Sequence, residues 1–334
     1  MISAGLFDLQ VNGYAGVDFN DTRITAGQLD VALEAMLVSG VTQCLPTIIT
    51  AQPEELIERF SALDSAVRTS RLGPLMVPGY HLEGPFLNSA DGYSGCHPQN
   101  AMTDPDVDLI AQIEAKISRP ILLVTLAPER EGAMAFIAEM RGRGKTLAMA
   151  HSAAGFAVVR AAADAGLSLS THLGNGLPQT LPKLENTLLA QLAETRLKAC
   201  LIADGHHMSS EALAALIRIK GTENCILVTD AVLGAAAAPG LYSFAGMGVE
   251  RTIEGAMVQP GRTHLAGSAL CLDQAVRNTL AWTGLDLDKV VAMASTAPRQ
   301  ALARSMAHYG IVNQPGRVRW TSDNVPKVET LPSL

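Results

Sequence analysis

Four apolar segments of the chain each end in a side chain that can bind a metal ion or carry a proton. Glu83 ends the first, His151 and His172 end the next two, and Asp230 ends the last. Buried parallel strands read as short apolar runs, and in a barrel of such strands the reactive groups lie at the carboxyl ends. A glutamate, two histidines and an aspartate that meet there would form a catalytic metal site with an open coordination position and a nearby base.

Three of these residues, Glu83, His151 and His172, are the predicted metal ligands. Taken singly, Glu83 before Gly84-Pro85 could instead cap a helix, and a histidine after small apolar residues is more often a hydrogen-bonded core side chain. Taken together, the three residues are better interpreted as metal ligands than as capping or core side chains. A buried ionised glutamate needs a partner, and the two histidines end successive strand–helix units.

Asp230 is the predicted proton carrier. It follows the most strongly apolar run, residues 225–228, and a carboxylate at the end of a buried strand is costly unless it meets a metal, a water bound there or a cation. The alternative is an N-cap for the next helix. We favour a catalytic role, in which Asp230 takes a proton from the attacking water and passes it to the leaving group.

Several further polar groups follow the predicted strands. His97 lies in a loop rich in glycine after the third strand, where it could also be a surface residue. Of His206 and His207, after the seventh strand, one should face the barrel mouth, and the spacing does not choose between them. The loops at 175–176 and 265–268 carry backbone amides that can hold oxyanions or hydroxyl groups.

The elements that must position these groups are visible as an alternation of strand-like and helix-period segments. Eight of each in alternation favour a (β/α)8 TIM-type barrel over an open doubly wound sheet. No Gly-x-Gly-x-x-Gly motif follows a strand, which argues against dinucleotide binding. The strands are predicted near 6–11, 42–49, 76–83, 121–126, 146–151, 167–172, 198–203 and 225–230, and the helices near 27–39, 53–68, 105–117, 131–142, 156–165, 184–195, 209–220 and 271–282.

The barrel is predicted to span 1–310 of the 334 residues. A chain of this length in one domain is typical of a TIM barrel. An insertion at about 234–266 is rich in Ala, Gly and Pro and then alternates in polarity, which predicts a small hairpin with Glu254-Gly255 at its turn. The tail, 311–334, is polar and could add a strand at 318–320 or lie along the surface.

Composition excludes several classes of partner. The net charge of −7 argues against nucleic-acid binding, because no basic surface is available to neutralise phosphates. No run of about 18 apolar residues predicts a membrane span, and the first residues lack a basic, cleavable leader. The five cysteines form no Cys-x-x-Cys pair, which is typical of a reduced, cytoplasmic protein.

These motifs together resemble the amidohydrolase superfamily and, within it, the N-acetylglucosamine-6-phosphate deacetylases. The resemblance runs from about residue 5 to about residue 304. It is specific because the motifs occur in the family's order. They are Asp8-Leu9-Gln10-Val11-Asn12-Gly13, Gly16-Val17-Asp18-Phe19-Asn20-Asp21, His81-Leu82-Glu83-Gly84-Pro85-Phe86, Thr171-His172-Leu173, Ile202-Ala203-Asp204-Gly205, Leu227-Val228-Thr229-Asp230-Ala231 and Leu265-Ala266-Gly267-Ser268-Ala269.

The resemblance implies a role for each matching residue. Glu83, His151 and His172 would bind the metal, and Asp230 would donate and accept the proton. His97, with Cys96 beside it, would orient the acyl group. The substrate-contacting positions implied by the resemblance are Asn175, Gly176, Lys183, Asp204, His207 rather than His206, Leu265, Ala266 and Gly267.

The chain departs from the superfamily pattern at one place, with a substitution that members of the deacetylase family share, and from the family pattern at two. Many amidohydrolases carry His-x-His on the first strand and bind two metals, whereas Gln10 and Asn12 stand here, so we expect one divalent metal, zinc. The family's small β-domain is expected to be reduced or absent. Where the family has an Arg-Glu-Pro-Gly-like stretch whose arginine grips the sugar phosphate, this chain offers Lys183, which replaces a bidentate arginine poorly.

We therefore expect a metal-dependent deacetylase that hydrolyses the N-acetyl amide of an amino sugar, N-acetylglucosamine-6-phosphate or a related N-acyl hexosamine, in a cytoplasmic homodimer. One alternative is an amidohydrolase acting on another N-acyl compound, such as an N-acyl amino acid or a cyclic amide. Another is a catalytically silent sugar-binding barrel, which would have no need of a proton carrier such as Asp230.

Overall fold

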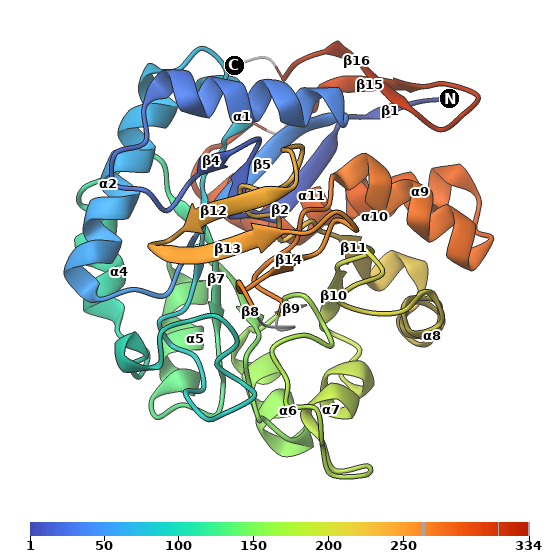
Figure 1. Ribbon diagram of the computed structural model, residues 1–334. Helices are drawn as coiled ribbons and strands as arrows, with labels where there is room; N and C mark the ends of the chain where they lie inside the picture. Colours follow the sequence, from blue (N-terminus) through green and yellow to red (C-terminus); the bar gives the residue numbers. More distant parts are fainter. Residues whose placement is uncertain (262–264, 313, 333–334) are drawn as a thin grey trace.

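The computed structural model, which describes residues 1–261, 265–312 and 314–332, contains a nearly closed barrel of eight parallel strands (Figure 1). Each strand pairs with the one that follows it along the chain, separated by helices, as βαβ units require. The strands, in order around the sheet, are β2 (Leu6–Val11), β5 (Val41–Ile49), β6 (Tyr80–Glu83), β7 (Ile121–Leu126), β8 (Thr146–Met149), β9 (Leu169–Ser170), β10 (Lys198–Leu201) and β11 (Cys225–Leu227).

The seam between the first and last strands is closed by contacts just beyond β11. The backbone N–H of Asp230 donates to the carbonyl of Gln10 at 2.9 Å, and Asn12 donates in the same way to Ala231 at 2.7 Å. Asp8, fully buried on β2, accepts a hydrogen bond from the Thr229 hydroxyl at 2.5 Å. The seam therefore holds Asp230 beside the end of β2.

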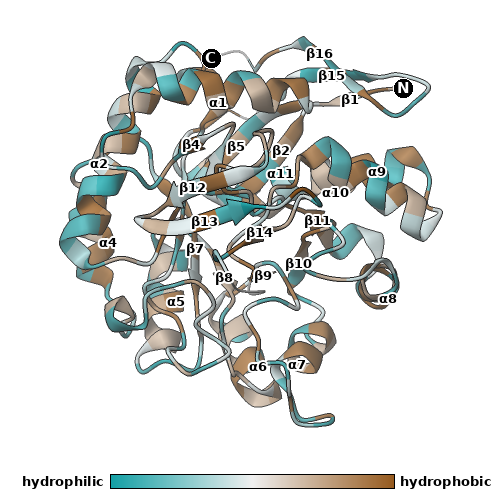
Figure 2. Ribbon diagram, in the orientation of Figure 1, coloured by the Kyte–Doolittle hydropathy of each residue, from teal (hydrophilic) through white to brown (hydrophobic). Residues whose placement is uncertain are grey.

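Helices surround the barrel, and Figure 2 shows them carrying both apolar and polar residues, as amphipathic helices do. Capping residues determine where several helices begin. Thr25 and Gln28, for example, form a reciprocal capping box at the start of α1. The helices are α1 (Ala26–Val38), α2 (Pro53–Thr69), α3 (Gly73–Met76), α4 (Val107–Glu114), α5 (Ala133–Gly142), α6 (Phe156–Ala165), α7 (Thr187–Ala193), α8 (Ser210–Lys220), α9 (Leu272–Thr283), α10 (Leu287–Ala294) and α11 (Thr296–His308), with 3-10 turns η1 (Gln99–Ala101) and η2 (Thr222–Asn224).

The two ends of the chain meet in a small antiparallel sheet beside the barrel (Figure 1). Its strands are β1 (Ile2–Ala4), β15 (Arg317–Trp320) and β16 (Pro326–Thr330). The indole N–H of Trp320 donates to the Ser3 hydroxyl at 2.9 Å, and Trp320 is nearly fully buried. Of the two possibilities for the tail, a strand through 318–320 is the one present, and its partners come from both termini.

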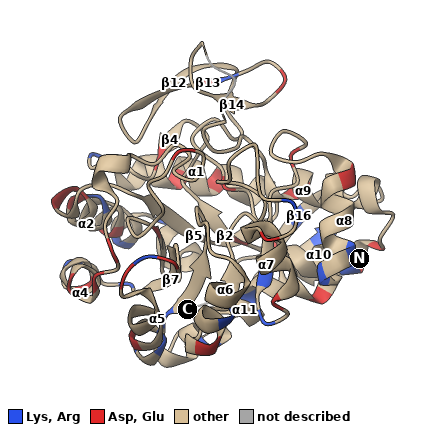
Figure 3. Cartoon of the chain, turned by 90° about the horizontal axis from the view of Figure 1, so that it is seen from below, with Lys and Arg blue, Asp and Glu red and all other residues tan. Residues whose placement is uncertain are grey.

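The insertion forms a second three-stranded sheet, here called the hairpin flap, that projects from one end of the barrel (Figure 3). Its strands are β12 (Gly240–Phe244), β13 (Met247–Arg251) and β14 (Met257–Val258). Glu254 and Gly255 lie in the β13–β14 connection, as expected, whereas β12 was not expected. The flap has its own apolar cluster, made with the ends of β5 and the loop after β11: Ile49, Val232, Leu233, Phe244, Val249, Met257 and Ala266.

A half-buried aspartate fastens the flap to the barrel. Asp18, in the two-residue strand β4 (Val17–Asp18) that pairs with β3 (Gly13–Tyr14), accepts a hydrogen bond from the Ala245 backbone at the β12–β13 turn, at 2.7 Å. Its other oxygen accepts from the Asn20 backbone at 2.8 Å. Asn20 in turn accepts from the Ile49 backbone at the end of β5. The turn of the flap is therefore tied to the barrel mouth.

The eight predicted strands and eight predicted helices are all present, with ends that differ by a few residues. Charged side chains lie mainly on the outer helices and loops (Figure 3). Among the helices in the described part of the chain, none is both long enough and apolar enough to cross a bilayer.

Candidate active site

A cavity of about 1180 Å³ opens at the carboxyl ends of the barrel strands. Its floor contains the predicted ligands Glu83, His151 and His172 and the predicted proton carrier Asp230, and His97 also lines it. The location is the one that the barrel architecture favours for chemistry. The hairpin flap and the loop after His172 form its outer walls.

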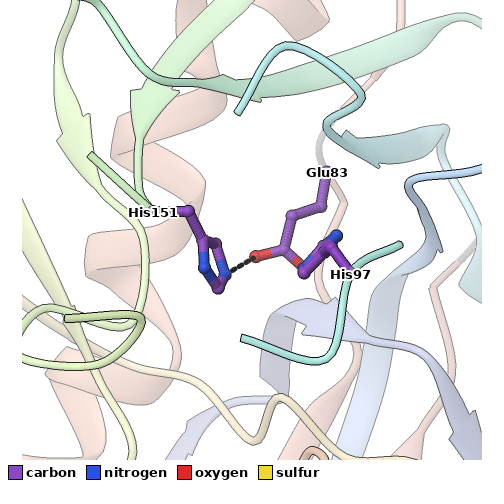
Figure 4. A group of neighbouring side chains, drawn as sticks. All are labelled: Glu83, His97 and His151. Atoms are coloured by element: carbon purple, nitrogen blue, oxygen red, sulfur yellow. Dashed lines mark ion pairs between the residues drawn. The ribbon is translucent and has the colours of Figure 1, made fainter. Parts of the chain in front are cut away.

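Glu83 is the centre of the cluster. Its Oε1 lies 2.8 Å from His172 Nε2 and 3.8 Å from His151 Nε2, while its Oε2 lies 3.9 Å from His97 Nε2. Figure 4 shows the carboxylate of Glu83 between the rings of His97 and His151, with the His151 contact drawn as a dashed line. One carboxylate therefore faces three imidazoles.

Two overlapping sets of side chains in this cluster could bind a metal. Glu83, His97 and His151 bring one ligand atom each to within 4.8 Å of one another. The predicted set replaces His97 by His172, whose Nε2 is closest to the carboxylate. Zinc bound tetrahedrally at about 2.0–2.1 Å separates neighbouring ligand atoms by roughly 3.3 Å, so the spacing of the Glu83, His97 and His151 set is of the right order.

Electrostatics favours a cation in this cluster. Burial lowers the pKa of His97 and His172 and lowers that of His151 to about 4, so all three rings are neutral at neutral pH and carry a lone pair. Burial also raises the pKa of Glu83, partly offset by His151 and Gln10. Neutral imidazoles leave the buried carboxylate without a compensating charge, whereas a divalent metal would supply one and use the lone pairs.

Hydrogen bonds to the Nδ1 atoms orient the rings of His151 and His97. His151 Nδ1 lies 2.6 Å from the Tyr93 carbonyl, which can only accept, so Nδ1 carries the hydrogen and Nε2 is free to bind. His97 Nδ1 lies 2.8 Å from the Thr50 hydroxyl, which can donate or accept, so either tautomer is compatible. His172 Nδ1 is buried without a hydrogen-bond partner among the described residues.

The backbone is strained where the reactive side chains enter the cavity. His151, His172 and Asp230 have φ of 49°, 32° and 49°, in the left-handed region that residues with a side chain rarely occupy. Such strain concentrates at functional sites, where the surrounding structure maintains it. Gly95 and Gly176 are required beside it, because a Cβ at either would lie within 2.9 Å of the His151 ring.

Asp230 is held as a proton acceptor. Its Oδ1 accepts a hydrogen bond from Asn12 Nδ2 at 2.8 Å. Burial and the charge of Glu83 raise its pKa to about 6, while His172, His207 and Asn12 act in the opposite direction. A carboxyl group with a pKa near 6 can take a proton and return it close to neutral pH.

The structure separates the other predicted site residues into those that line the cavity and those that do not. Cys96, Asn175, Gly176, His207, Leu265 and Gly267 line it. Asp204 lies behind His207 and accepts from its Nδ1 at 2.6 Å. Ala266 is buried in the flap cluster, and Lys183 is exposed in the loop before α7, outside the cavity lining. Both His206 and His207 line the cavity, but His207 is the half-buried one.

Sequence reasoning missed several groups that belong to the site. Thr50, which orients His97, is a polar residue directly after an apolar strand, a signal of the kind that identified Glu83. Asn12 lies at the end of β2 in the same way. Phe244, Thr252 and Val258 line the cavity from the flap, and no local pattern marks them.

Comparison with known proteins finds relatives that are named as deacetylases of amino sugar phosphates. No family model matches the chain. An N-acetylgalactosamine-6-phosphate deacetylase from Escherichia coli O157:H7 is 32% identical over 303 residues, which cover 90% of this chain and 78% of that protein. The N-acetylglucosamine-6-phosphate deacetylases of Lysinibacillus sphaericus and Homo sapiens are each 30% identical, over 89% and 90% of this chain and 75% and 74% of their own lengths.

Solved structures are similar over almost the whole chain. A mutant N-acetyl-D-glucosamine-6-phosphate deacetylase from Mycobacterium smegmatis, in complex with N-acetyl-D-glucosamine-6-phosphate, superposes with a TM-score of 0.85 at 26% identity. The match covers 98% of this chain and 85% of that one. The N-acetylglucosamine-6-phosphate deacetylase of Pasteurella multocida gives a TM-score of 0.84 at 25% identity over the same shares.

Proposed function

The chain belongs to the N-acetylglucosamine-6-phosphate deacetylase family, and on that premise we propose that it hydrolyses the N-acetyl amide of an amino sugar. The observation that carries the proposal is the buried cluster of one carboxylate and three neutral imidazoles beside Asp230, at the carboxyl ends of the strands. A site with these groups and an adjacent acid suits metal-assisted amide hydrolysis.

One divalent metal, zinc, is proposed to bind Glu83, His151 and His172. Supporting this set, Glu83 Oε1 faces both histidines, and the tautomer of His151 leaves Nε2 free. Nitrogen and carboxylate donors suit zinc, and the neutral amides Gln10 and Asn12 on β2 offer no second set of good ligands. When bound, the metal polarises the acyl carbonyl and makes water a better nucleophile.

Asp230 carries the proton in this proposal. It accepts a proton from water as the water attacks the acyl carbon, and it then returns the proton to the nitrogen as the C–N bond breaks. Asn12 holds Oδ1 of Asp230, which leaves Oδ2 for the transfer. The single carboxyl group therefore serves as base first and as acid second.

His97 is proposed to orient the acyl oxygen. Its lowered pKa keeps the ring neutral. If the Thr50 hydroxyl donates to Nδ1, the hydrogen lies on Nε2, which points into the cluster and can donate to the developing oxyanion. The competing role for His97 is that of third metal ligand in place of His172.

Substrate contacts are proposed for the remaining cavity residues. The backbone and side chain of Asn175, with Gly176, border the cluster, and His207 is held in position by Asp204. The loop 265–267 borders the cavity beside Asp230, since the Ser268 backbone donates to the Asp230 carbonyl at 3.1 Å. Lys183 would contribute only if the substrate reaches the exposed rim.

We further propose a cytoplasmic homodimer and a division of the chain into a barrel at 1–310 and a tail at 311–334. The tail, with β1, would represent a reduced form of the family's small β-domain, which is supported by the three-stranded sheet β1–β15–β16. Size-exclusion chromatography with light scattering tests the dimer.

The test of the function is hydrolysis by the metal-loaded enzyme of a panel of N-acetylhexosamines, their 6-phosphates, N-acetyl amino acids and cyclic amides. Release of acetate from at least one amino sugar supports the proposal. Turnover of only the amino acids or cyclic amides would assign a different amidohydrolase activity. Sugar binding without turnover would identify a silent sugar-binding barrel.

A further inference from the structure

β7 is the barrel strand whose carboxyl end supplies none of the described residues that line the cavity. The loop after β7 instead carries Glu129, a half-buried carboxylate. The neighbours of β7 in the sheet are β6, which ends in Glu83, and β8, which leads to His151. Glu129 is therefore placed to contact the loops that follow both of these strands.

Both carboxylate oxygens of Glu129 accept hydrogen bonds from these two loops. From the loop after β8, the Ser152 hydroxyl donates to Oε2 at 2.6 Å, and the Ala153 backbone N–H donates to Oε1 at 2.6 Å. From the loop after β6, Asn88 Nδ2 donates to Oε1 at 2.9 Å. Hydrogen bonds to an ionised carboxylate are stronger than those between neutral groups. One side chain therefore joins the two loops firmly.

The residue beside these contacts is His151, whose backbone is strained. Its φ of 49° lies in the left-handed region, and such strain persists only where the surrounding contacts maintain it. The Asn88 backbone N–H donates to the His151 carbonyl at 3.1 Å. Ser152 and Ala153, which Glu129 holds, are the next two residues of the chain. Glu129 thus fixes both the segment after His151 and the residue that holds its carbonyl group.

The loop after β6 also orients the imidazole ring of His151. Asn88 Oδ1 accepts from the Ala90 backbone N–H at 2.9 Å, and the Ala90 carbonyl accepts from the Tyr93 backbone N–H at 3.1 Å. The Tyr93 carbonyl is in turn the acceptor 2.6 Å from His151 Nδ1. A series of hydrogen bonds therefore runs from Glu129 through Asn88 to the His151 ring that Figure 4 draws.

We propose that Glu129 is a positioning residue for the metal site, and that it holds the backbone and the ring of His151 in the geometry that binds the metal. Glu129 acts through Asn88, Ser152 and Ala153, and it lies outside the described cavity lining. Loss of a group that orients a metal ligand typically costs about 10- to 100-fold in metal affinity. The inference rests on the proposed role of His151 as a ligand in the deacetylase site.

The test measures the zinc Kd of purified variants by competition with a chelator of known affinity. Glu129→Ala removes all three hydrogen bonds, so its zinc Kd is expected to rise about 10- to 100-fold. Glu129→Gln keeps an acceptor oxygen, and its amide nitrogen can donate to the Ser152 hydroxyl, so its Kd should stay within about threefold of the wild type. The matched control is Asp30→Ala, because Asp30 on α1 accepts in the same way from the backbone N–H groups of Arg71 and Leu72. Its zinc Kd should be unchanged.

A wild-type zinc Kd in Glu129→Ala overturns the inference, even if the Tm of the variant falls, because Glu129 would then serve folding alone. A rise in Kd of the same size in Glu129→Gln or in Asp30→Ala also overturns it, since the hydrogen bonds of Glu129 would not be what sets the affinity. Ser152→Ala removes one of the three hydrogen bonds and keeps the carboxylate, so it serves if Glu129→Ala does not fold. Its zinc Kd should rise at least about threefold, and an unchanged value counts against the inference.

Cobalt(II) in place of zinc reports the geometry of the ligands without any need for turnover. The visible absorption spectrum of cobalt-loaded Glu129→Ala should differ from that of the wild type, and Glu129→Gln should restore the wild-type spectrum. Identical spectra for the wild type and Glu129→Ala overturn the inference. His151→Ala separates this failure from that of the proposed site: wild-type zinc affinity in His151→Ala would overturn the ligand assignment itself, whereas weakened binding there with unchanged binding in Glu129→Ala overturns the positioning role alone.

Discussion

Asp8 is predicted to keep its proton in the folded protein below a pH of about 7, and its substitution by asparagine should remove a pH dependence of stability. Burial raises the pKa of Asp8 from 3.8 to about 7, opposed by hydrogen bonds from Thr229 and Gln10. A protonated Asp8 can donate to the Thr229 hydroxyl, which donates onward to the Gln10 carbonyl, while its other oxygen accepts from the two backbone N–H groups. An asparagine at position 8 can make the same three contacts.

The size and sign of the change in stability follow from the pKa shift of Asp8. Because the folded state holds the proton more tightly, the wild type loses unfolding free energy as the pH rises from about 4 to about 7. At 1.36 kcal/mol for each pH unit, the full loss is about 4 kcal/mol, and about 3 kcal/mol of it falls between pH 5 and pH 8. Asp8→Asn cannot titrate, so its stability relative to the wild type should rise by that amount over this interval.

Urea unfolding of the wild type and of Asp8→Asn at pH 5 and at pH 8 measures this difference. Asp323→Asn, in the exposed loop between β15 and β16, is a matched control that retains Asp8, so its stability should fall between the two pH values as much as that of the wild type. A stability difference between Asp8→Asn and the wild type that is the same at both pH values would refute the reasoning. Asp8 would then be ionised in the fold.

Three further predictions concern the site and the flap. Elemental analysis should find one transition metal per chain, and His151→Ala should lose most of the metal and the activity together; two stoichiometric metals would contradict the reading of Gln10 and Asn12. His172→Ala should lose more metal than His97→Ala, whereas the reverse order would assign His97 as the third ligand. Asp18→Ala removes a charged hydrogen-bond acceptor that contributes about 1.5–3 kcal/mol to holding the flap. Amide hydrogen exchange at the flap turn 244–247 should therefore accelerate roughly 10- to 100-fold, and KM should rise. Unchanged exchange would show that the flap is held by its apolar cluster alone.

The barrel could be predicted from the sequence because its elements are encoded locally. Each strand is a short apolar run, and the helices repeat with a period of 3.6 residues, so both their existence and their order are visible. The ends are less certain because tertiary contacts decide them: β9 is reduced to two residues, since the chain turns at Thr171 to present His172. β12 escaped prediction because it is largely exposed and is held by pairing with β13.

The site could be predicted in part for the same reason. Residues at strand ends must converge in a barrel, which located Glu83, His151, His172 and Asp230. The orientation of a loop residue depends on contacts far along the chain, so the offset of Lys183 within its loop did not reveal that it lies outside the cavity lining. The flap residues were invisible for the same reason, because the Asp18–Ala245 contact joins positions 227 residues apart.

Acetate release from an N-acetylhexosamine or its 6-phosphate, by metal-loaded wild type and by metal-loaded Asp230→Asn, tests most directly whether the protein is a deacetylase. The wild type should release equal amounts of acetate and free amino sugar. In Asp230→Asn, metal and sugar binding should be retained while kcat falls by roughly 10²–10⁴, because the proton carrier alone is lost. A kcat of the variant within a few-fold of the wild type would contradict the role of Asp230, and no acetate release by the wild type from any N-acetylhexosamine or its 6-phosphate would contradict the deacetylase function.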